Sequence, residues 1–245
     1  MTDREERLLS LYFGNDPEKM KEARKRLEEH EPIDYILGET VFYNETYTVT
    51  PDVLIPRPDT ERVVEQVLKL LPPGGRLLDL CAGSGCIAIS TLCHSKDTTA
   101  LLVDISPAAL EIARKNAARN GVLDRCSFLC ADLKKRPELP GGFDVIASNP
   151  PYVASAVVDT LEEECHREPR EAFDGGGDGG DFYRLFLGYC PPLLAPKGKL
   201  VFEIGYDQRR LIEALCLRRR YAVKIYKDYG KNDRVAVIDP GGMNH

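Results

Sequence analysis

The sequence predicts an α/β fold in which a mostly parallel sheet carries helices on both faces. From Arg76 onward, apolar runs typical of buried strands alternate with stretches of helical spacing, which is the pattern of successive βαβ units. Strands are expected at 76–81, 99–104, 125–130, 143–148, 197–204, 221–227 and 233–239, and helices at 85–94, 106–120, 179–190 and 206–218. The last two strands are joined by a short link that is too short for a parallel crossover, so they should pair antiparallel.

Residues 1–31 are expected to form a short N-terminal helical segment. Their apolar residues recur at helical spacing among many charges, and Gly14-Asn15-Asp16-Pro17 interrupts the pattern. Asp16 is a suitable N-cap, and Pro17 suits the first position of a helix. Two short helices are therefore predicted.

Residues 32–58 should form a β-hairpin and a connector. Apolar and polar residues alternate over 39–49, a pattern that predicts two short antiparallel strands. Prolines then stiffen the connector. The main domain, residues 59–245, should begin with a helix that is capped by Asp59 and runs to Leu71.

Composition excludes several classes of protein. The chain has 245 residues, enough for one main domain with a sizeable core. Its formal net charge of −6 argues against a large nucleic-acid footprint, which would be basic. It has no apolar run of membrane-spanning length and does not open with a signal-peptide pattern, so a cytoplasmic protein is expected. None of its eight cysteines forms a C-x-x-C pair, which favours free thiols over disulfides or a metal site.

The segment Asn149-Pro150-Pro151-Tyr152 is the most informative motif. It follows the apolar run 143–148 and so lies at the carboxyl end of a predicted strand, where open α/β sheets place their ligands. The prolines leave carbonyl acceptors on a rigid loop, Asn149 adds an acceptor and two donors, and Tyr152 adds a flat ring. Such a loop suits a planar amide or amino group held through both of its hydrogens. The alternative is a simple strand-ending turn, because Asn-Pro is common turn chemistry.

A second motif begins where an apolar strand ends at Asp79 and small residues lead into a helix. The turn consists of Cys81, Ala82, Gly83, Ser84 and Gly85. Its glycines let the backbone approach a ligand without obstruction by a Cβ atom. The third glycine of the dinucleotide-binding pattern is absent, since position 88 is alanine. Asp79 would repel a pyrophosphate but suits the cationic amino acid part of a ligand.

Asp104 ends the next apolar run, 25 residues after Asp79, a spacing that fits one βαβ unit. A carboxylate in this position can hydrogen-bond a ribose diol. A cationic amino acid joined to a ribose and an adenine is S-adenosylmethionine, so this cofactor is expected. The alternative is that both aspartates cap the helices that follow their strands.

With further signatures, these motifs resemble the HemK-type methyltransferases, also called PrmC-type, which methylate the side-chain amide nitrogen (N5) of the glutamine in the Gly-Gly-Gln motif of class 1 peptide-chain release factors. The further stretches are Pro32 to Gly38, Ile55 to Glu61, Val103 to Pro107, Glu168-Pro169 and Glu203 to Tyr206. The resemblance implies a Rossmann-like, seven-stranded class I methyltransferase fold with the last strand antiparallel, and an enzyme that modulates translation termination. Asn-Pro-Pro-Tyr is shared with adenine-N6 methyltransferases, so an enzyme acting on nucleic acid is the alternative.

The resemblance also implies a role for each site residue. The cofactor would be bound by Asp79, Cys81, Ala82, Gly83, Ser84, Gly85, Asp104, Asp132, Leu133 and Asn149. The substrate glutamine would be held by Asn149, Pro150, Pro151 and Tyr152, of which Asn149, Pro150 and Tyr152 would act in catalysis. The implied partner is a class 1 release factor, with no metal, membrane or direct nucleic-acid partner, and the chain is expected to be a monomer.

Two departures from the family pattern stand out. Cys81-Ala82 occupies the place of a usual Gly-Thr pair, and the N-terminal segment is shorter than the family's helical domain. Two further residues have alternative interpretations. Arg57 is either close to the site or an ion-pair partner in the connector, and Glu203 is either an acid near the site or a charge at a strand end.

Overall fold

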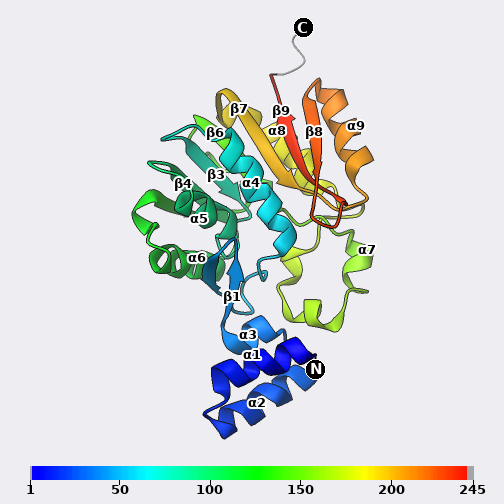
Figure 1. Ribbon diagram of the computed structural model, residues 1–245. Coiled ribbons are helices and arrows are strands. Elements are labelled where there is room, and N and C mark those ends of the chain that lie inside the picture. Colours follow the sequence, from blue (N-terminus) through cyan, green and yellow to red (C-terminus); the bar gives the residue numbers. More distant parts are fainter. Residues whose placement is uncertain (1, 242–245) are drawn as a thin grey trace.

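The computed structural model describes residues 2–241. Its main body is a seven-stranded sheet with the order β5-β4-β3-β6-β7-β9-β8, drawn as arrows in Figure 1. The strands are β3 (Arg76–Leu80), β4 (Thr99–Asp104), β5 (Cys126–Cys130), β6 (Phe143–Ser148), β7 (Leu194–Glu203), β8 (Ala222–Lys227) and β9 (Asp233–Asp239). The strands β3 to β7 run parallel, and β9 lies antiparallel between β7 and β8. The predicted fold class, with its antiparallel last strand, is confirmed.

Each face of the sheet is covered by its own helices. They are α4 (Glu61–Leu70), α5 (Cys86–Cys93), α6 (Pro107–Arg119), α8 (Asp181–Tyr189) and α9 (Arg209–Arg219). Because successive strand residues point to opposite faces, Leu77 and Val145 pack with α4, α5 and α6, whereas Leu78 and Ile146 pack with α8 and α9. This arrangement leaves the carboxyl ends of the parallel strands to loops, and these loops form the site.

The N-terminal segment consists of α1 (Asp3–Phe13) and α2 (Pro17–Glu28), which confirms the two predicted helices. The Asp16 carboxylate caps α2 by accepting a hydrogen bond of 3.1 Å from the Lys19 backbone nitrogen. A third helix, α3 (Ile33–Leu37), was not predicted, because five residues are too few to reveal a period. Leu9, Ala23 and Ile36 join the three helices in an apolar cluster of their own. The three helices lie below the main body in Figure 1.

The predicted hairpin is present as β1 (Glu39–Phe42) and β2 (Glu45–Thr48). Its turn residues Tyr43 and Asn44 both have positive φ, 51° and 75°, as a two-residue hairpin turn requires. Phe42 and Tyr47 are fully buried in the cluster under α4 and α5. The hairpin therefore packs on the sheet domain through its aromatic residues.

The start of the main domain differs from the prediction. Pro58–Thr60 form a 3₁₀ turn, and α4 begins only at Glu61. Asp59 does not cap this helix; its carboxylate pairs with Arg234 of β9 at 3.2 Å. Because this tertiary ion pair engages the Asp59 carboxylate, the side chain does not cap the helix.

The remaining helical elements are short. They are α7 (Ser155–Val158) and the 3₁₀ turns Leu123–Arg125, Leu133–Lys135, Glu163–Arg167, Arg170–Ala172 and Pro191–Leu193. Three of them lie between β6 and α8, so the chain makes a long excursion after the Asn-Pro-Pro-Tyr segment before it returns to the sheet. Within residues 2–241, no helix combines the length and apolar character needed to cross a bilayer.

Candidate active site

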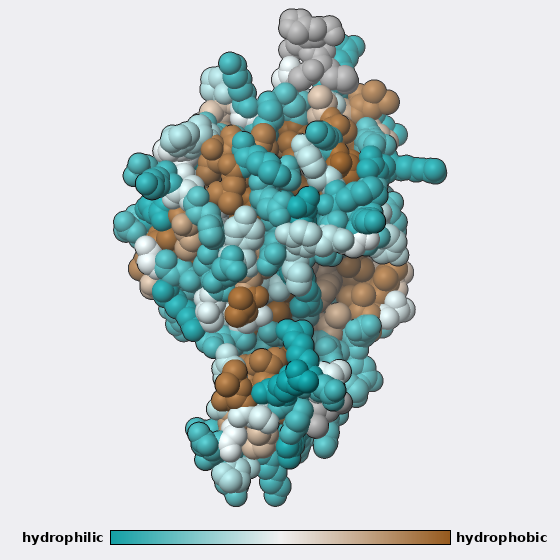
Figure 2. Space-filling model, in the orientation of Figure 1, coloured by the Kyte–Doolittle hydropathy of each residue, from teal (hydrophilic) through white to brown (hydrophobic). Residues whose placement is uncertain are grey.

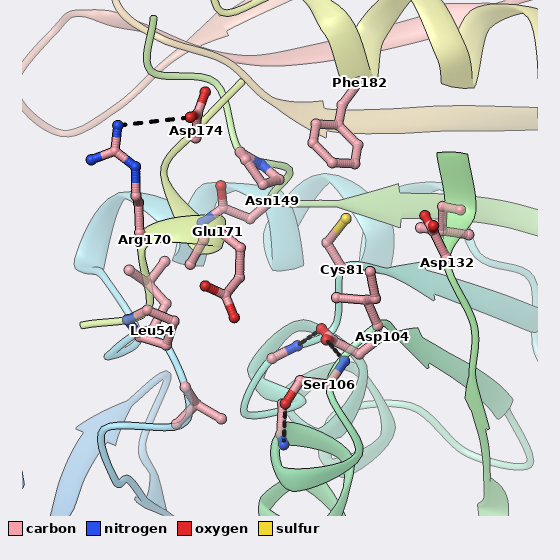
Figure 3. A pocket seen from close by; sticks show the side chains of 18 of the residues that line it. Leu54, Cys81, Asp104, Ser106, Asp132, Asn149, Arg170, Glu171, Asp174 and Phe182 are labelled. Atoms are coloured by element: carbon pink, nitrogen blue, oxygen red, sulfur yellow. Dashed lines mark hydrogen bonds and ion pairs between the residues drawn. The ribbon is translucent and has the colours of Figure 1, made fainter. Parts of the chain in front are cut away.

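A cavity of about 630 Å³ opens at the carboxyl ends of β3, β4 and β6, and Figure 3 shows it from close by. Seven of the predicted site residues line it: Cys81, Gly83, Asp104, Asp132, Leu133, Asn149 and Pro151. The other six do not line it: Asp79, Ala82, Ser84, Gly85, Pro150 and Tyr152. The structure thus brings the small-residue turn, the strand ends and the Asn-Pro-Pro-Tyr segment together around one space.

The two glycines of the turn have different functions. Both have positive φ, 53° at Gly83 and 80° at Gly85. A Cβ atom at Gly83 would meet nothing within 4 Å, so this residue faces the open cavity. A Cβ atom at Gly85 would lie 2.8 Å from Ile89 Cδ1 and 3.1 Å from Leu102 Cδ2. Gly83 therefore suits a ligand-facing position, whereas Gly85 lets α5 pack closely on β4.

Cys81 adopts the left-handed backbone conformation that glycine takes most easily. Its φ is +57°, in the left-handed region that costs a non-glycine residue free energy. Its sulfur lines the cavity, between Asn149 and Asp104 in the view of Figure 3. Burial raises the pKa of this thiol well above its usual range, so the side chain presents a neutral, weakly polar surface.

Asp104 both braces the turn and faces the cavity. One carboxylate oxygen accepts from the Gly83 backbone nitrogen at 2.8 Å, and the other accepts from the Ser106 nitrogen at 2.9 Å. Burial raises the pKa of Asp104, and these backbone hydrogen bonds oppose the shift. The helix-capping alternative does not apply, because Ser106 itself caps α6 through the Ala109 nitrogen. A carboxylate with remaining lone pairs thus stands at the cavity wall.

Asp79 lies beneath the turn and is fully buried. Its Oδ2 accepts from the Ala88 nitrogen in the first turn of α5 at 3.1 Å, which agrees with the capping alternative. Its Oδ1 is buried and has no hydrogen-bond partner among the described residues. Burial raises the pKa of Asp79 to about 8. Asp79 does not line the cavity, and a cationic ligand group above the turn would favour its ionised form.

Asn149 is held on its far side by a buried network of Thr60, Glu203 and Tyr152, of which the sequence had not singled out Thr60. Its Nδ2 donates to the Thr60 hydroxyl at 3.2 Å, and Thr60 donates to Glu203 Oε2 at 2.6 Å. The Tyr152 hydroxyl donates to Glu203 Oε1 at 3.1 Å. Burial raises the pKa of Glu203 to about 7. The hydroxyl of Tyr152 therefore points to this network, and Tyr152 does not line the cavity. Its expected part in holding the substrate amide stays a prediction. The only sequence signal for Thr60 was its place in the Ile55 to Glu61 stretch.

The opposite wall comes from the segment after residue 168, in which the sequence had not singled out Arg170 or Glu171. Arg170, Glu171 and Asp174 line the cavity, and Figure 3 marks the ion pair between Arg170 and Asp174, which is 4.0 Å long. The connector closes the wall with Leu54. Loop residues of this kind have no periodicity that would indicate their place in advance.

Arg57 and Glu168 join the connector to this wall. Arg57 forms an ion pair with Glu168, and the second carboxylate oxygen of Glu168 accepts from the Ile55 backbone nitrogen at 3.0 Å. The ion-pair interpretation of Arg57 is therefore the one that the structure supports. Among residues 2–241, no group of three or more histidine, cysteine, aspartate or glutamate side chains is arranged to hold a metal ion.

Comparisons with known proteins agree on one type of enzyme. The model of the methyltransferase small domain matches residues 60–178. A release factor glutamine methyltransferase of Geobacter sulfurreducens is 39% identical over 96% of this chain and 81% of its own length. One of Thermodesulfovibrio yellowstonii is 36% identical over 89% of this chain and 80% of its own.

A solved structure shows how widely the fold is shared. The hMettl16 catalytic domain, in complex with an RNA hairpin, covers 80% of this chain and 76% of its own with a TM-score of 0.62. At 15% identity this likeness concerns the fold alone. The extent and identity of the sequence relatives decide the family: the chain belongs to the release factor glutamine methyltransferases.

Proposed function

We propose that this protein transfers a methyl group from S-adenosylmethionine to the side-chain amide nitrogen (N5) of the glutamine in the Gly-Gly-Gln motif of class 1 peptide-chain release factors, and so modulates translation termination. The names of its sequence relatives support this substrate. The observation that carries the proposal is the Asn149 carboxamide at the cavity wall, held through its nitrogen by Thr60. This arrangement leaves the amide oxygen for a hydrogen of the substrate.

The cavity suits S-adenosylmethionine in shape and charge. Gly83 opens it at the turn, Asp104 offers carboxylate lone pairs for the ribose, and Asp132 and Leu133 border the place of the adenine. The buried Asp79 lies beneath the turn with one unpartnered oxygen, and a bound cationic group would favour the ionised form of this carboxyl group. When bound, the cofactor supplies an electrophilic methyl group.

The residues of this chain would promote transfer mainly by orientation. An amide nitrogen is a poor nucleophile because its lone pair is delocalised into the carbonyl. Acceptors for both N–H bonds, the Asn149 oxygen and the Pro150 carbonyl, would fix the plane of the substrate amide and direct its lone pair toward the methyl group. No general base is needed before transfer, because the proton leaves afterwards from a more acidic product.

The N-terminal segment, residues 1–31, is proposed to contact the release factor rather than the cofactor. None of its described residues lines the cavity. It is tied to the segment that leads into the cavity wall, since Arg167 donates to the Glu29 carbonyl at 2.6 Å and His30 lies 2.9 Å from Glu163. A surface on these helices would therefore lie beside the path of a protein substrate.

The enzyme is further proposed to be a cytosolic monomer that does not bind nucleic acid directly. All eight cysteines are free thiols, which suits a reducing compartment. The net charge of −6 favours a protein partner over a polyanion. The face drawn in Figure 2 is largely hydrophilic, with several apolar patches between the polar side chains.

One incubation distinguishes the proposed substrate from the alternative. The protein is mixed with methyl-labelled S-adenosylmethionine and, separately, with a class 1 release factor, the same factor with its Gly-Gly-Gln glutamine replaced by alanine, and adenine-containing DNA or RNA. Label should enter the first acceptor alone. Label in the nucleic acid, or equal label in both release factors, would overturn the proposal.

A further inference from the structure

The Asn149 carboxamide belongs to a chain of buried hydrogen bonds that ends in a carboxylate. Thr60 and Glu203 are each about 1% exposed, and neither lines the cavity. The contacts run from Asn149 Nδ2 to Thr60 Oγ1 at 3.2 Å and from Thr60 Oγ1 to Glu203 Oε2 at 2.6 Å. Thr60 lies on the 3₁₀ turn before α4 and Glu203 at the end of β7, so two distant elements meet behind the site.

The chemistry of these groups fixes the direction of each hydrogen bond. An ionised carboxylate accepts only, and a hydroxyl has a single hydrogen to give. Since Glu203 takes the hydrogen of Thr60, the Thr60 oxygen can only accept from Asn149. The carboxamide must therefore turn its NH₂ group toward Thr60. A flipped carboxamide would set two oxygens against each other at this contact.

We propose that Thr60 and Glu203 are positioning residues that fix the flip state of the Asn149 carboxamide, so that its oxygen rather than its nitrogen meets the substrate amide. This inference rests on the proposed methyl transfer to an amide. An N–H of the substrate would find an acceptor in the native flip state and another donor in the flipped one. Neither Thr60 nor Glu203 needs to touch the substrate for this effect.

Glu203→Gln would reverse the direction of the hydrogen bonds that link residue 203, Thr60 and Asn149 without removing them. The Tyr152 hydroxyl donates to one oxygen of Glu203, so the carbonyl oxygen of the new glutamine would take that contact and its NH₂ group would face Thr60. Thr60 would then accept from glutamine and give its own hydrogen to Asn149. The Asn149 oxygen would then turn toward Thr60 and away from the cavity. This near-isosteric variant therefore tests directly whether Thr60 and Glu203 set the orientation of the Asn149 carboxamide.

Thr60→Val removes the hydroxyl group at the centre of these hydrogen bonds, whereas Thr60→Ser keeps it. Single-turnover methyl transfer at saturating cofactor should fall on the order of 10- to 100-fold in Thr60→Val and Glu203→Gln, the effect of losing one oriented hydrogen bond. Thr60→Ser should stay within about threefold of wild type. The double variant Thr60→Val with Glu203→Gln should be no slower than the slower single variant, because both act through the same carboxamide.

The chain offers a matched control in Thr91. This buried threonine of α5 has no hydrogen-bond partner for its hydroxyl among the described residues, so Thr91→Val makes the same chemical change without breaking the network. Its transfer rate should equal that of wild type. If Thr60→Val transfers methyl groups at the wild-type rate, or if its cofactor affinity and melting temperature fall in proportion to its rate, the positioning role is wrong.

A second readout does not depend on activity. In protein labelled with ¹⁵N-asparagine, the side-chain NH₂ signals of Asn149, assigned by their loss in Asn149→Ala, should shift in Thr60→Val and Glu203→Gln but not in Thr60→Ser or Thr91→Val. Unchanged signals in the first two variants would overturn the inference. A wild-type protein that methylates no amide would defeat the proposed function instead, while these signals would still decide the orientation of Asn149.

Discussion

The side-chain nitrogen of Asn149 lies 3.2 Å from the Thr60 hydroxyl oxygen, although 89 positions separate the two residues in the sequence. This contact joins the Asn-Pro-Pro-Tyr segment to the connector stretch that precedes α4. It explains why two motifs far apart in the chain belong to one site. It also orients the one side chain on which the proposed chemistry depends most.

Asn149→Ala should leave the protein folded and strongly slow methyl transfer. The substitution removes one side-chain hydrogen bond of the protein but also the oriented acceptor for the substrate amide. We expect a loss on the order of 10²-fold in the single-turnover rate, comparable to the loss of one oriented hydrogen-bonding group in other active sites, with little change in release-factor affinity. Rates close to wild type in a folded variant would contradict the mechanism.

Asp104→Ala should weaken S-adenosylmethionine binding by about 1.5–3 kcal/mol, since a charged hydrogen-bond acceptor is lost. The turn should also loosen, because Asp104 accepts from the Gly83 nitrogen. Calorimetric titration measures the affinity, and Asp124→Ala, an exposed aspartate outside the cavity, serves as the control. Equal affinities for the two variants would remove Asp104 from the cofactor site.

Asp79→Asn should change how stability depends on pH. Burial raises the pKa of Asp79 to about 8 in the folded protein, above its value of about 3.9 in an unfolded chain. The folded state therefore holds the proton more tightly, and the stability that this contributes is present below pH 4 and lost as pH rises toward 8. Asparagine cannot ionise, so the melting temperature of the variant relative to wild type should rise between pH 5 and pH 9. We expect at least about 2–4 °C, the shift that 1 kcal/mol produces in a chain of this size. A difference that is constant across this range would show that Asp79 keeps an ordinary pKa.

The transfer rate should fall as pH drops below about 7, because burial raises the pKa of Glu203 to about 7. A protonated Glu203 can donate to Thr60, which frees Asn149 to flip. The charged and titratable groups that act on Glu203 are Arg234, Asp59 and Tyr152. Single-turnover rates between pH 5.5 and 8.5 should show this acidic limb in wild type and lack it in Glu203→Gln. An identical limb in both proteins would assign it to another group.

Deletion of residues 1–31 should raise the Michaelis constant for a whole release factor and leave cofactor affinity nearly unchanged. A short Gly-Gly-Gln peptide should be affected much less, because it does not reach these helices. The deletion also uncovers Ile36, which packs against them, so Leu11→Glu, at a side chain that is 77% exposed, tests the same surface without disturbing that cluster. If cofactor affinity and melting temperature fall together in both variants, the segment has a structural role only.

Most of the fold followed from the sequence because its signals are local. Apolar runs, helical spacing and the Asp16-Pro17 start of α2 each depend on neighbouring residues, and the strands and main helices lie where these patterns indicated. The Asp59 cap was predicted by the same logic and is wrong, because the Asp59 carboxylate pairs instead with Arg234, 175 positions away.

The site was predicted in part for the same reason. Gly83, Asp104 and Asn149 lie at strand ends, which a parallel sheet brings to one edge. Thr60 and the wall around Arg170 could not be found in this way, because only tertiary packing brings them to the site. The hydrogen bond from the Tyr152 hydroxyl to Glu203 is likewise a tertiary contact that the motif alone does not indicate.

The most direct test of the central claim identifies the methylated atom. A release factor is incubated with this protein and S-adenosylmethionine, digested, and analysed by tandem mass spectrometry, and the modified peptide is then hydrolysed in acid. We expect one added methyl group on the glutamine of Gly-Gly-Gln, and release of methylamine on hydrolysis because the methyl group is on the amide nitrogen. A methyl group on any other residue, or a modified glutamine that releases only ammonia, would contradict it.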